Sequence, residues 1–164
     1  MADILVVNAS PLIFLGNAGR IGLLRATGAH RIIVPEPVFR EVTSGGHRDA
    51  ASTALSEAPW LEKGALTETP PSVIAWDLGA GESSVIGTAM ALPGAIAVID
   101  DLNGRKCGRA LGVRIMGTLG VVIGAYRQGV VGNPRAVLLE LRTAGMWLSD
   151  AAIARALHHA GIEG

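Results

Sequence analysis

Short apolar runs separated by longer mixed stretches dominate the pattern along the chain. Ile4–Val7, Arg31–Val34 and Ala95–Ile99 are runs of this kind, and Val113–Met116 is a shorter one. Apolar runs of this length without alternation are typical of strands buried on both faces, as in parallel sheets. The segment from Trp60 to Leu66 is ambiguous.

Between these runs, apolar residues recur at helical spacing, and capping residues mark helix ends. Ser10 and Pro11 are predicted as N-cap and first residue of a helix through Leu15. The helix that starts at Pro35 is predicted to end at Gly45–Gly46. Ser149 is predicted to cap the last helix. Further helices are predicted over 21–26, 47–57, 81–92, 118–127 and 133–143, and from the third run to residue 111.

Strands that alternate with helices predict an α/β sandwich around a mostly parallel central sheet. The chain has 164 residues, and no linker or low-complexity segment divides it, so a single domain over 1–164 is expected. In such folds, ligands lie beyond the carboxyl ends of the strands. Functional residues are therefore expected there.

Charge and composition exclude some classes of function. Lysine plus arginine and aspartate plus glutamate are 14 each, which argues against a protein that coats nucleic acid by bulk charge. The longest apolar run, 115–126, has about 12 residues and is too short to span a membrane. Cys107 is the only cysteine, so internal disulfides and cysteine metal clusters are excluded. With no basic leader before the first apolar run, a cytoplasmic location is expected.

Polar residues follow two of the predicted strands. The first run leads into Asn8 and the third into Asp100 and Asp101, so in a parallel sheet these side chains meet at one edge. Two adjacent carboxylates repel each other unless a cation or hydrogen-bond donors offset them. The alternative is that one aspartate caps the next helix while the other faces water.

Two glutamates are further candidates. Glu82 shares its helix face with Val85 and Ile86, which predicts a carboxylate directed towards the sheet. The alternative is a solvated residue favoured by the helix dipole. Glu41 cannot be distinguished from Glu36 by spacing alone.

Four segments in order resemble the motifs of PIN-domain nucleases. They are VVNASPLI at 6–13, VPEPVFRE at 34–41, LGAGE at 78–82 and VIDD at 98–101. The later segments IMGTLG at 115–120 and AGMWLS at 144–149 are similar to a poorly characterised branch related to the toxins of toxin–antitoxin pairs. The resemblance spans nearly the whole chain and implies a three-layer sandwich.

The resemblance also implies an acidic pocket that holds Mg²⁺ or Mn²⁺ and acts on RNA. By position, Glu41, Glu82, Asp100 and Asp101 would be the catalytic and metal-binding acids. Asn8 falls where the wider family has its first aspartate, and an amide oxygen can still bind a hard cation. The remaining candidates are for substrate binding: Ser10, placed by the resemblance, and Arg105 and Arg109, four apart on one predicted helix, for flanking phosphate.

Three functions compete. The first is a metal-dependent endoribonuclease, as the toxin of a toxin–antitoxin pair. The second is a catalytically silent PIN-like module that binds RNA or protein, which the neutral Asn8 favours. The third, a small-molecule phosphohydrolase, lacks an aspartate nucleophile after the first strand. Candidate partners are an RNA substrate, a small antitoxin protein and a second copy of the chain in a homodimer.

Overall fold

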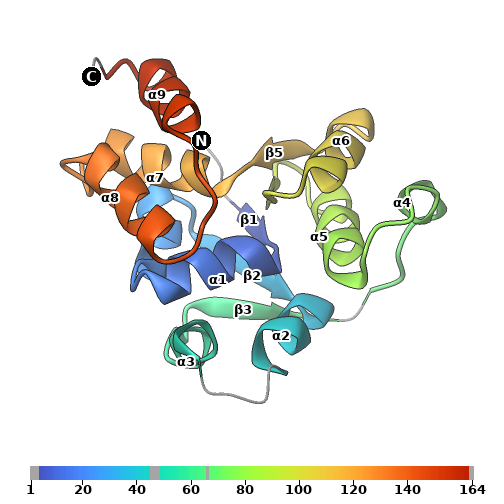
Figure 1. The fold of residues 1–164 in the computed structure, drawn as a ribbon. Coiled ribbons are helices and arrows are strands. Elements are labelled where there is room, and N and C mark those ends of the chain that lie inside the picture. The colour runs from blue at the N-terminus through green and yellow to red at the C-terminus, as the bar shows by residue number, and fades with distance from the viewer. Residues whose placement is uncertain (1–3, 45–48, 66, 163–164) are drawn as a thin grey trace.

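A five-stranded, all-parallel sheet forms the centre of the protein. A computed structural model describes residues 4–44, 49–65 and 67–162. The strands run in the order β3-β2-β1-β4-β5, as Figure 1 shows. Their bounds are β1 Ile4–Val7, β2 Arg31–Pro35, β3 Leu61–Gly64, β4 Ile96–Val98 and β5 Arg114–Met116. The four apolar runs are therefore confirmed as strands.

Helices cover both faces of the sheet and complete the three layers. In Figure 1, α1, α7 and α8 lie on one side of the strands, and α5 and α6 lie on the other. The helices are α1 Ala9–Asn17, α2 Glu36–Thr43, α3 Ala50–Ser56, α4 Pro71–Ile74, α5 Ala80–Ala91, α6 Leu102–Ala110, α7 Thr118–Arg127, α8 Pro134–Thr143 and α9 Asp150–His159, with a 3-10 helix η1 at Ile21–Thr27. None in the described ranges is long and apolar enough to cross a membrane.

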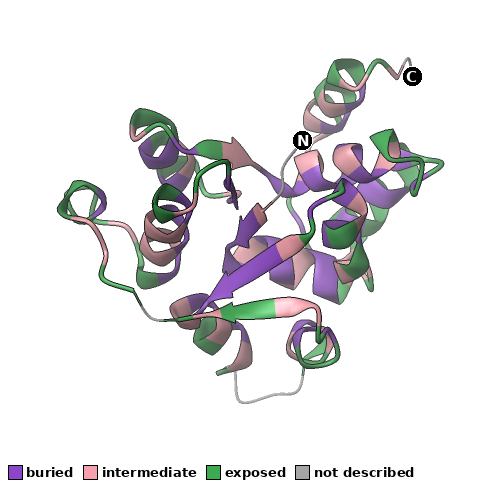
Figure 2. Cartoon of the chain, turned by 180° about the vertical axis from the view of Figure 1, so that it is seen from behind, coloured by how far each residue is buried: buried purple, intermediate pink, exposed green. Residues whose placement is uncertain are grey.

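The edge strand β3 resolves the ambiguous segment. It pairs in parallel with β2, and its two middle residues are exposed. Figure 2 shows this strand largely exposed, in front of buried strands. Glu62 forms a two-pronged ion pair with Arg31 of the neighbouring strand. Because its middle residues are exposed to solvent, its sequence lacks the apolar run of strands that are buried on both faces.

The start of α1 corrects the predicted cap at Ser10. The helix begins at Ala9 with Asn8 in the N-cap position, but the Asn8 side chain makes no capping hydrogen bond. That side chain is turned towards α5 instead. The cap at Ser149 is confirmed, because its hydroxyl accepts a hydrogen bond from the Ala152 amide. The predicted end of α2 at Gly45–Gly46, and the start of the next helix at His47, lie outside the described residues.

The register of the strands positions the carboxyl edge. Val7 pairs with Val98, and Val98 pairs with Met116. The segments that follow β1, β4 and β5 therefore leave the sheet side by side. The strands β1 and β4 are buried and anchor these segments to the core, whereas β5 is only partly buried. Side chains far apart in sequence meet at this edge for that reason.

Candidate active site

Asn8 is the most enclosed candidate at the carboxyl edge. Its side chain is 1% exposed, and its backbone amide donates to the Val98 carbonyl at 3.0 Å. The side-chain Nδ2 donates to Glu82 Oε1 at 3.4 Å. Its Oδ1 is buried and, within the described residues, has no hydrogen-bond partner. A buried amide oxygen without a donor costs about 1–3 kcal/mol, so this atom is available to a ligand.

Glu82 faces the sheet, as its position on the helix predicted. It lies in the first turn of α5, where Val85 and Ile86 anchor the helix in the core. Its side chain is half-buried and contacts Asn8. The alternative of a glutamate extended into solvent is not what the structure has.

Glu41 reaches the same place from α2. A Cβ added to Gly81 would lie 3.0 Å from Glu41 Oε2 and 3.3 Å from Asn8 Oδ1, so both oxygens border the space above this glycine. Partial burial, and secondarily the negative charge of Glu82, raise the pKa of Glu41. Glu36, the competing candidate, forms ion pairs with Arg40 and Lys63 instead. Asn8, Glu41 and Glu82 therefore form one cluster of oxygen atoms.

Asp101 lies beside this cluster and also caps a helix. Its Oδ2 accepts a hydrogen bond from the Gly104 amide at 2.8 Å, which fixes the start of α6. A Cβ added to Gly104 would lie 3.5 Å from Asp101 Oδ2 and 3.6 Å from Glu82 Cγ. The capping alternative is thus correct for Asp101, and the residue still borders Glu82.

Asp100 is held by a residue that the sequence did not single out. Thr118 is fully buried, donates its amide to Asp100 Oδ1 at 2.8 Å and its hydroxyl to Oδ2 at 2.5 Å. Both carboxylate oxygens of Asp100 therefore have protein donors. Thr118 could have been found by the rule that selected Asn8, because it is a polar residue just beyond a strand.

The residues proposed for substrate binding lie at different distances from the acids. Ser10 is half-buried in the first turn of α1. Arg105 borders Asp100, because a Cβ on Gly117 would lie 2.6 Å from Arg105 Nη1 and 3.1 Å from Asp100 Oδ1. Arg109 is exposed in the last turn of α6 and does not line the cavity that Arg105 and Asp100 share.

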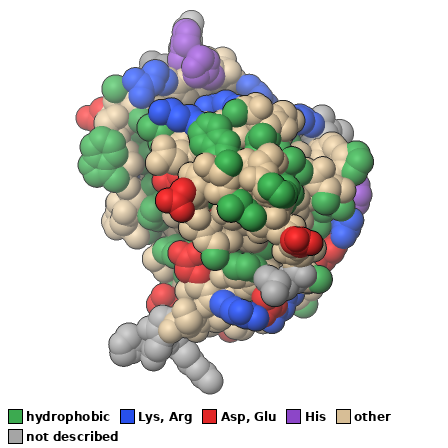
Figure 3. Space-filling model, turned by 90° about the vertical axis from the view of Figure 1, so that its right-hand side faces the viewer, with side chains coloured by type: hydrophobic (Ala, Val, Ile, Leu, Met, Phe, Trp, Pro, Cys, Tyr) green, Lys and Arg blue, Asp and Glu red, His purple; other side chains and the backbone are tan. Residues whose placement is uncertain are grey.

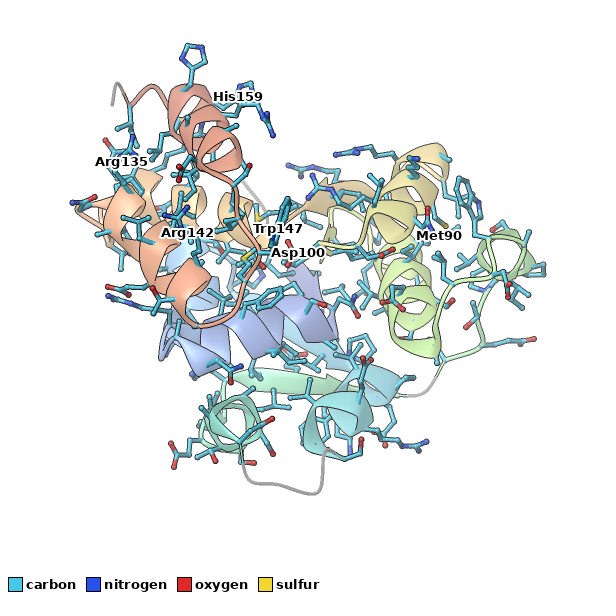
Figure 4. All side chains as sticks on the ribbon, viewed as in Figure 1. Met90, Asp100, Arg135, Arg142, Trp147 and His159 are labelled. Atoms are coloured by element: carbon cyan, nitrogen blue, oxygen red, sulfur yellow. The ribbon has the colours of Figure 1, made fainter. Side chains whose placement is uncertain are left out.

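The carboxyl edge of the sheet carries Asn8, Glu41, Glu82, Asp100 and Asp101, and we call it the acidic edge. It supplies oxygen ligands for a metal ion but no complete set of charged ligands. Within the described ranges, no three His, Cys, Asp or Glu side chains are grouped closely enough to hold a metal ion. The donors that fit a hard cation are the free oxygen of Asn8 and the carboxylates of Glu41 and Glu82. Asp100 lies further along the same edge, near the centre of Figure 4.

Residues 4–162 of the chain match the PIN-domain family. The chain belongs to the PIN-domain family. PIN domains are generally nucleases and usually use Mg²⁺ or Mn²⁺, and the oxygen cluster of this PIN domain agrees with that chemistry. No curated protein matches the sequence.

Proposed function

We propose that this PIN domain is a metal-dependent endoribonuclease that hydrolyses RNA phosphodiester bonds. The observation that carries the proposal is the buried Oδ1 of Asn8, which has no partner in the described part of the chain. A cation bound there would satisfy this oxygen and offset the repulsion between Glu41 and Glu82. Glu41 and Glu82, two of the acids chosen by the family resemblance, thus lie beside this unpartnered oxygen.

The chemistry would divide between the bound ion and the side chains around it. When bound, Mg²⁺ or Mn²⁺ polarises a phosphate and makes a deprotonated water available. Asn8, Glu41 and Glu82 would hold the ion. Thr118 fixes the carboxylate of Asp100 through two hydrogen bonds, and the Gly104 amide orients Asp101. Arg105 would bind a phosphate that flanks the cleaved bond.

The cellular role that we infer is that of the toxin in a toxin–antitoxin pair, in the cytoplasm. It is supported by the likeness of segments 115–120 and 144–149 to the toxin-related branch. A small antitoxin protein and a homodimer are the partners that this role would bring. A short reading frame directly upstream of the gene would support the role, and its absence would count against it.

A catalytically silent module that binds RNA or protein is the second candidate. Two observations favour it. Asn8 brings no negative charge, and Asp100 already accepts two hydrogen bonds from Thr118. Fewer charged ligands would then remain for an ion, and metal affinity would be weak.

Cleavage of a mixed-sequence RNA oligonucleotide in Mn²⁺ and in EDTA separates the two candidates. We expect cleavage in Mn²⁺ only. Glu82→Gln should lower the rate at least about 100-fold, because even changes to residues behind the metal ligands cost 10–100-fold. Glu57→Gln, in an exposed residue at the end of α3, is the matched control. RNA binding without cleavage would favour the silent module. Cleavage in EDTA would contradict the proposed dependence of the reaction on a metal ion.

A further inference from the structure

A groove leads away from the acidic edge between α7 and α9. A cavity of about 500 Å³ starts at Asp100 and Arg105 and reaches Arg155 and His159 of α9. A second cavity of about 330 Å³ shares His159 and extends to Arg127 at the end of α7. Asp100 and His159, both labelled in Figure 4, thus line the same groove although they come from the end of β4 and from α9. The groove joins the candidate active site to a surface formed by α7 and α9, outside the acidic edge.

One face of α9 forms the outer wall. Ala152, Arg155, Ala156 and His159 line the cavity, and their spacing places them on one side of the helix. Ile153 and Leu157 are buried and hold α9 against the core. The Arg127 guanidinium also donates to the His159 carbonyl, so α7 and α9 are tied together at the far end. The wall is therefore a fixed part of the fold.

The charged side chains that line the groove are mainly positive. Arg105, Arg127 and Arg155 line it, whereas Asp100 is the only acidic residue of the described chain that does. None of these arginines forms an ion pair in the described part of the chain, whereas Arg20, Arg31, Arg40 and Arg142 each pair with a carboxylate. Figure 3 shows Lys and Arg side chains in a band below the histidines at the top of that view. Guanidinium groups left without carboxylates are suited to phosphate.

Two glycines keep the floor of the groove open. A Cβ on Gly117 would lie 2.6 Å from Arg105 Nη1, and a Cβ on Gly120 would lie 2.7 Å from Met116 Cγ. A larger residue at Gly117 would displace the Arg105 guanidinium. Met116 and Leu119 add apolar surface beside the cations. A groove with spaced cations and apolar walls fits a single nucleic-acid strand better than one isolated anion.

We propose that this groove binds the backbone of the RNA strand on one side of the cleaved bond, with Arg155 and Arg127 on successive phosphates beyond Arg105. The inference rests on the proposed function, because it assumes that the strand enters the acidic edge. It adds that α9 sets the path of the substrate. RNA and single-stranded DNA share the phosphodiester that these arginines would contact.

Binding of a fluorescein-labelled 12-nucleotide oligouridylate, followed by anisotropy in EDTA over a series of salt concentrations, tests the proposal. Arg155→Gln should raise Kd about fivefold and lower the salt slope by about 0.7, the value for one phosphate contact on a single strand. Arg135→Gln removes the same charge from an exposed residue of α8 that lines neither cavity and should leave Kd unchanged. An oligothymidylate arm distinguishes RNA from DNA.

The outcomes are separable from those of the cleavage assay. Unchanged RNA affinity in Arg155→Gln would overturn the proposal that the groove binds RNA. It would favour an acidic segment of a protein partner as the ligand of the groove. Equal loss in Arg155→Gln and Arg135→Gln would reduce the effect to net charge and would also overturn it. Binding that depends on Arg155, in a protein that cleaves nothing in Mn²⁺, would support the groove while the nuclease proposal fails. Melting temperatures of both variants verify that they fold.

Discussion

At the scale of single residues, the environment of Asn8 explains why an amide can occupy this position. Its Nδ2 donates to Glu82, while its Oδ1 points to the space that Glu41 also borders. An aspartate would offer no donor to Glu82 and would add a third negative charge. The amide thus stabilises the metal-free edge while it leaves one oxygen for a cation.

Asn8→Asp should therefore have opposite effects without and with metal. In EDTA we expect it to lower the free energy of unfolding by about 1–3 kcal/mol, because the hydrogen bond to Glu82 is lost among like charges. In millimolar Mn²⁺ it should raise metal affinity, since hard cations gain from added carboxylates. Thermal melts with and without Mn²⁺ measure both effects.

Asn133→Asp is the matched control for Asn8→Asp. Asn133 caps α8, and its Oδ1 accepts from the Ala136 amide, a role that aspartate fills equally well. It should change neither the melt in EDTA nor the shift with Mn²⁺. Unchanged metal affinity in a folded Asn8→Asp variant would show that Asn8 does not bind the ion.

Gly81 is the second residue whose identity matters for the proposed metal site, because a side chain there would fill the space between the oxygen atoms. Its position in α5 would otherwise favour alanine by about 1 kcal/mol. An added Cβ would meet Glu41 Oε2 at 3.0 Å and would occupy the space between the oxygens. We expect Gly81→Ala to fold with a similar melting temperature in EDTA but to lose most of the stabilisation by Mn²⁺. Gly22→Ala, where a Cβ meets nothing within 4 Å, is the control. A full Mn²⁺ shift in Gly81→Ala would place the ion elsewhere.

At the scale of elements, Thr118 joins the end of β4 to the start of α7. Its amide and hydroxyl both reach the Asp100 carboxylate, although the two residues are 18 positions apart. The threonine is fully buried, so water cannot replace its hydroxyl without a rearrangement of this junction. The strand ends are thus fixed to each other by side chains as well as by the sheet.

Thr118→Val keeps the shape of the side chain and removes the donor. We expect a loss of about 1.5–3 kcal/mol in the free energy of unfolding, the range for a hydrogen bond to a charged group. Thr118→Ser should restore most of this stability because it restores the hydroxyl. Denaturant unfolding of the three proteins measures the difference. A valine variant as stable as wild type would show that the hydroxyl contributes nothing there.

At the scale of the whole molecule, the crowded carboxylates link stability to pH. The pKa of Glu41 is raised above its ordinary 4.5, first by burial and then by Glu82. The folded state therefore binds this proton more tightly than the unfolded state does. Ionised Glu41 opposes folding, so its contribution becomes less favourable as pH rises from 4.5 through the raised pKa.

Glu41→Gln isolates this contribution. In EDTA, we expect the variant to gain stability relative to wild type as pH rises through that window, and the difference to become constant above it. Near pH 3, well below the ordinary pKa of 4.5, Glu41 is protonated in both states and the two proteins should unfold alike. Denaturant unfolding across this range gives the comparison. A difference independent of pH would mean that Glu41 has the same pKa folded and unfolded.

Four of the five strands in the described residues, most of the helices and the family could be predicted from the sequence alone, whereas the edge strand β3 could not. Three of the four short apolar runs become central strands because both of their faces are buried, and the fourth becomes the edge strand β5. The caps at Asn133 and Ser149 depend only on local hydrogen bonds. The direction of the Glu82 side chain, towards the sheet, also follows from its spacing to Val85 and Ile86. Each of these features needs information from only a few neighbouring residues.

The tertiary structure decided which polar groups meet. Asn8 leaves its local helix uncapped because a distant carboxylate, Glu82, accepts its amide. Asp100 and Asp101, adjacent in sequence, diverge because Thr118 holds the first and the start of α6 holds the second. Arg155 reaches the acidic edge only through the packing of α9. Such contacts join segments far apart in the chain, and spacing along the sequence carries no record of them.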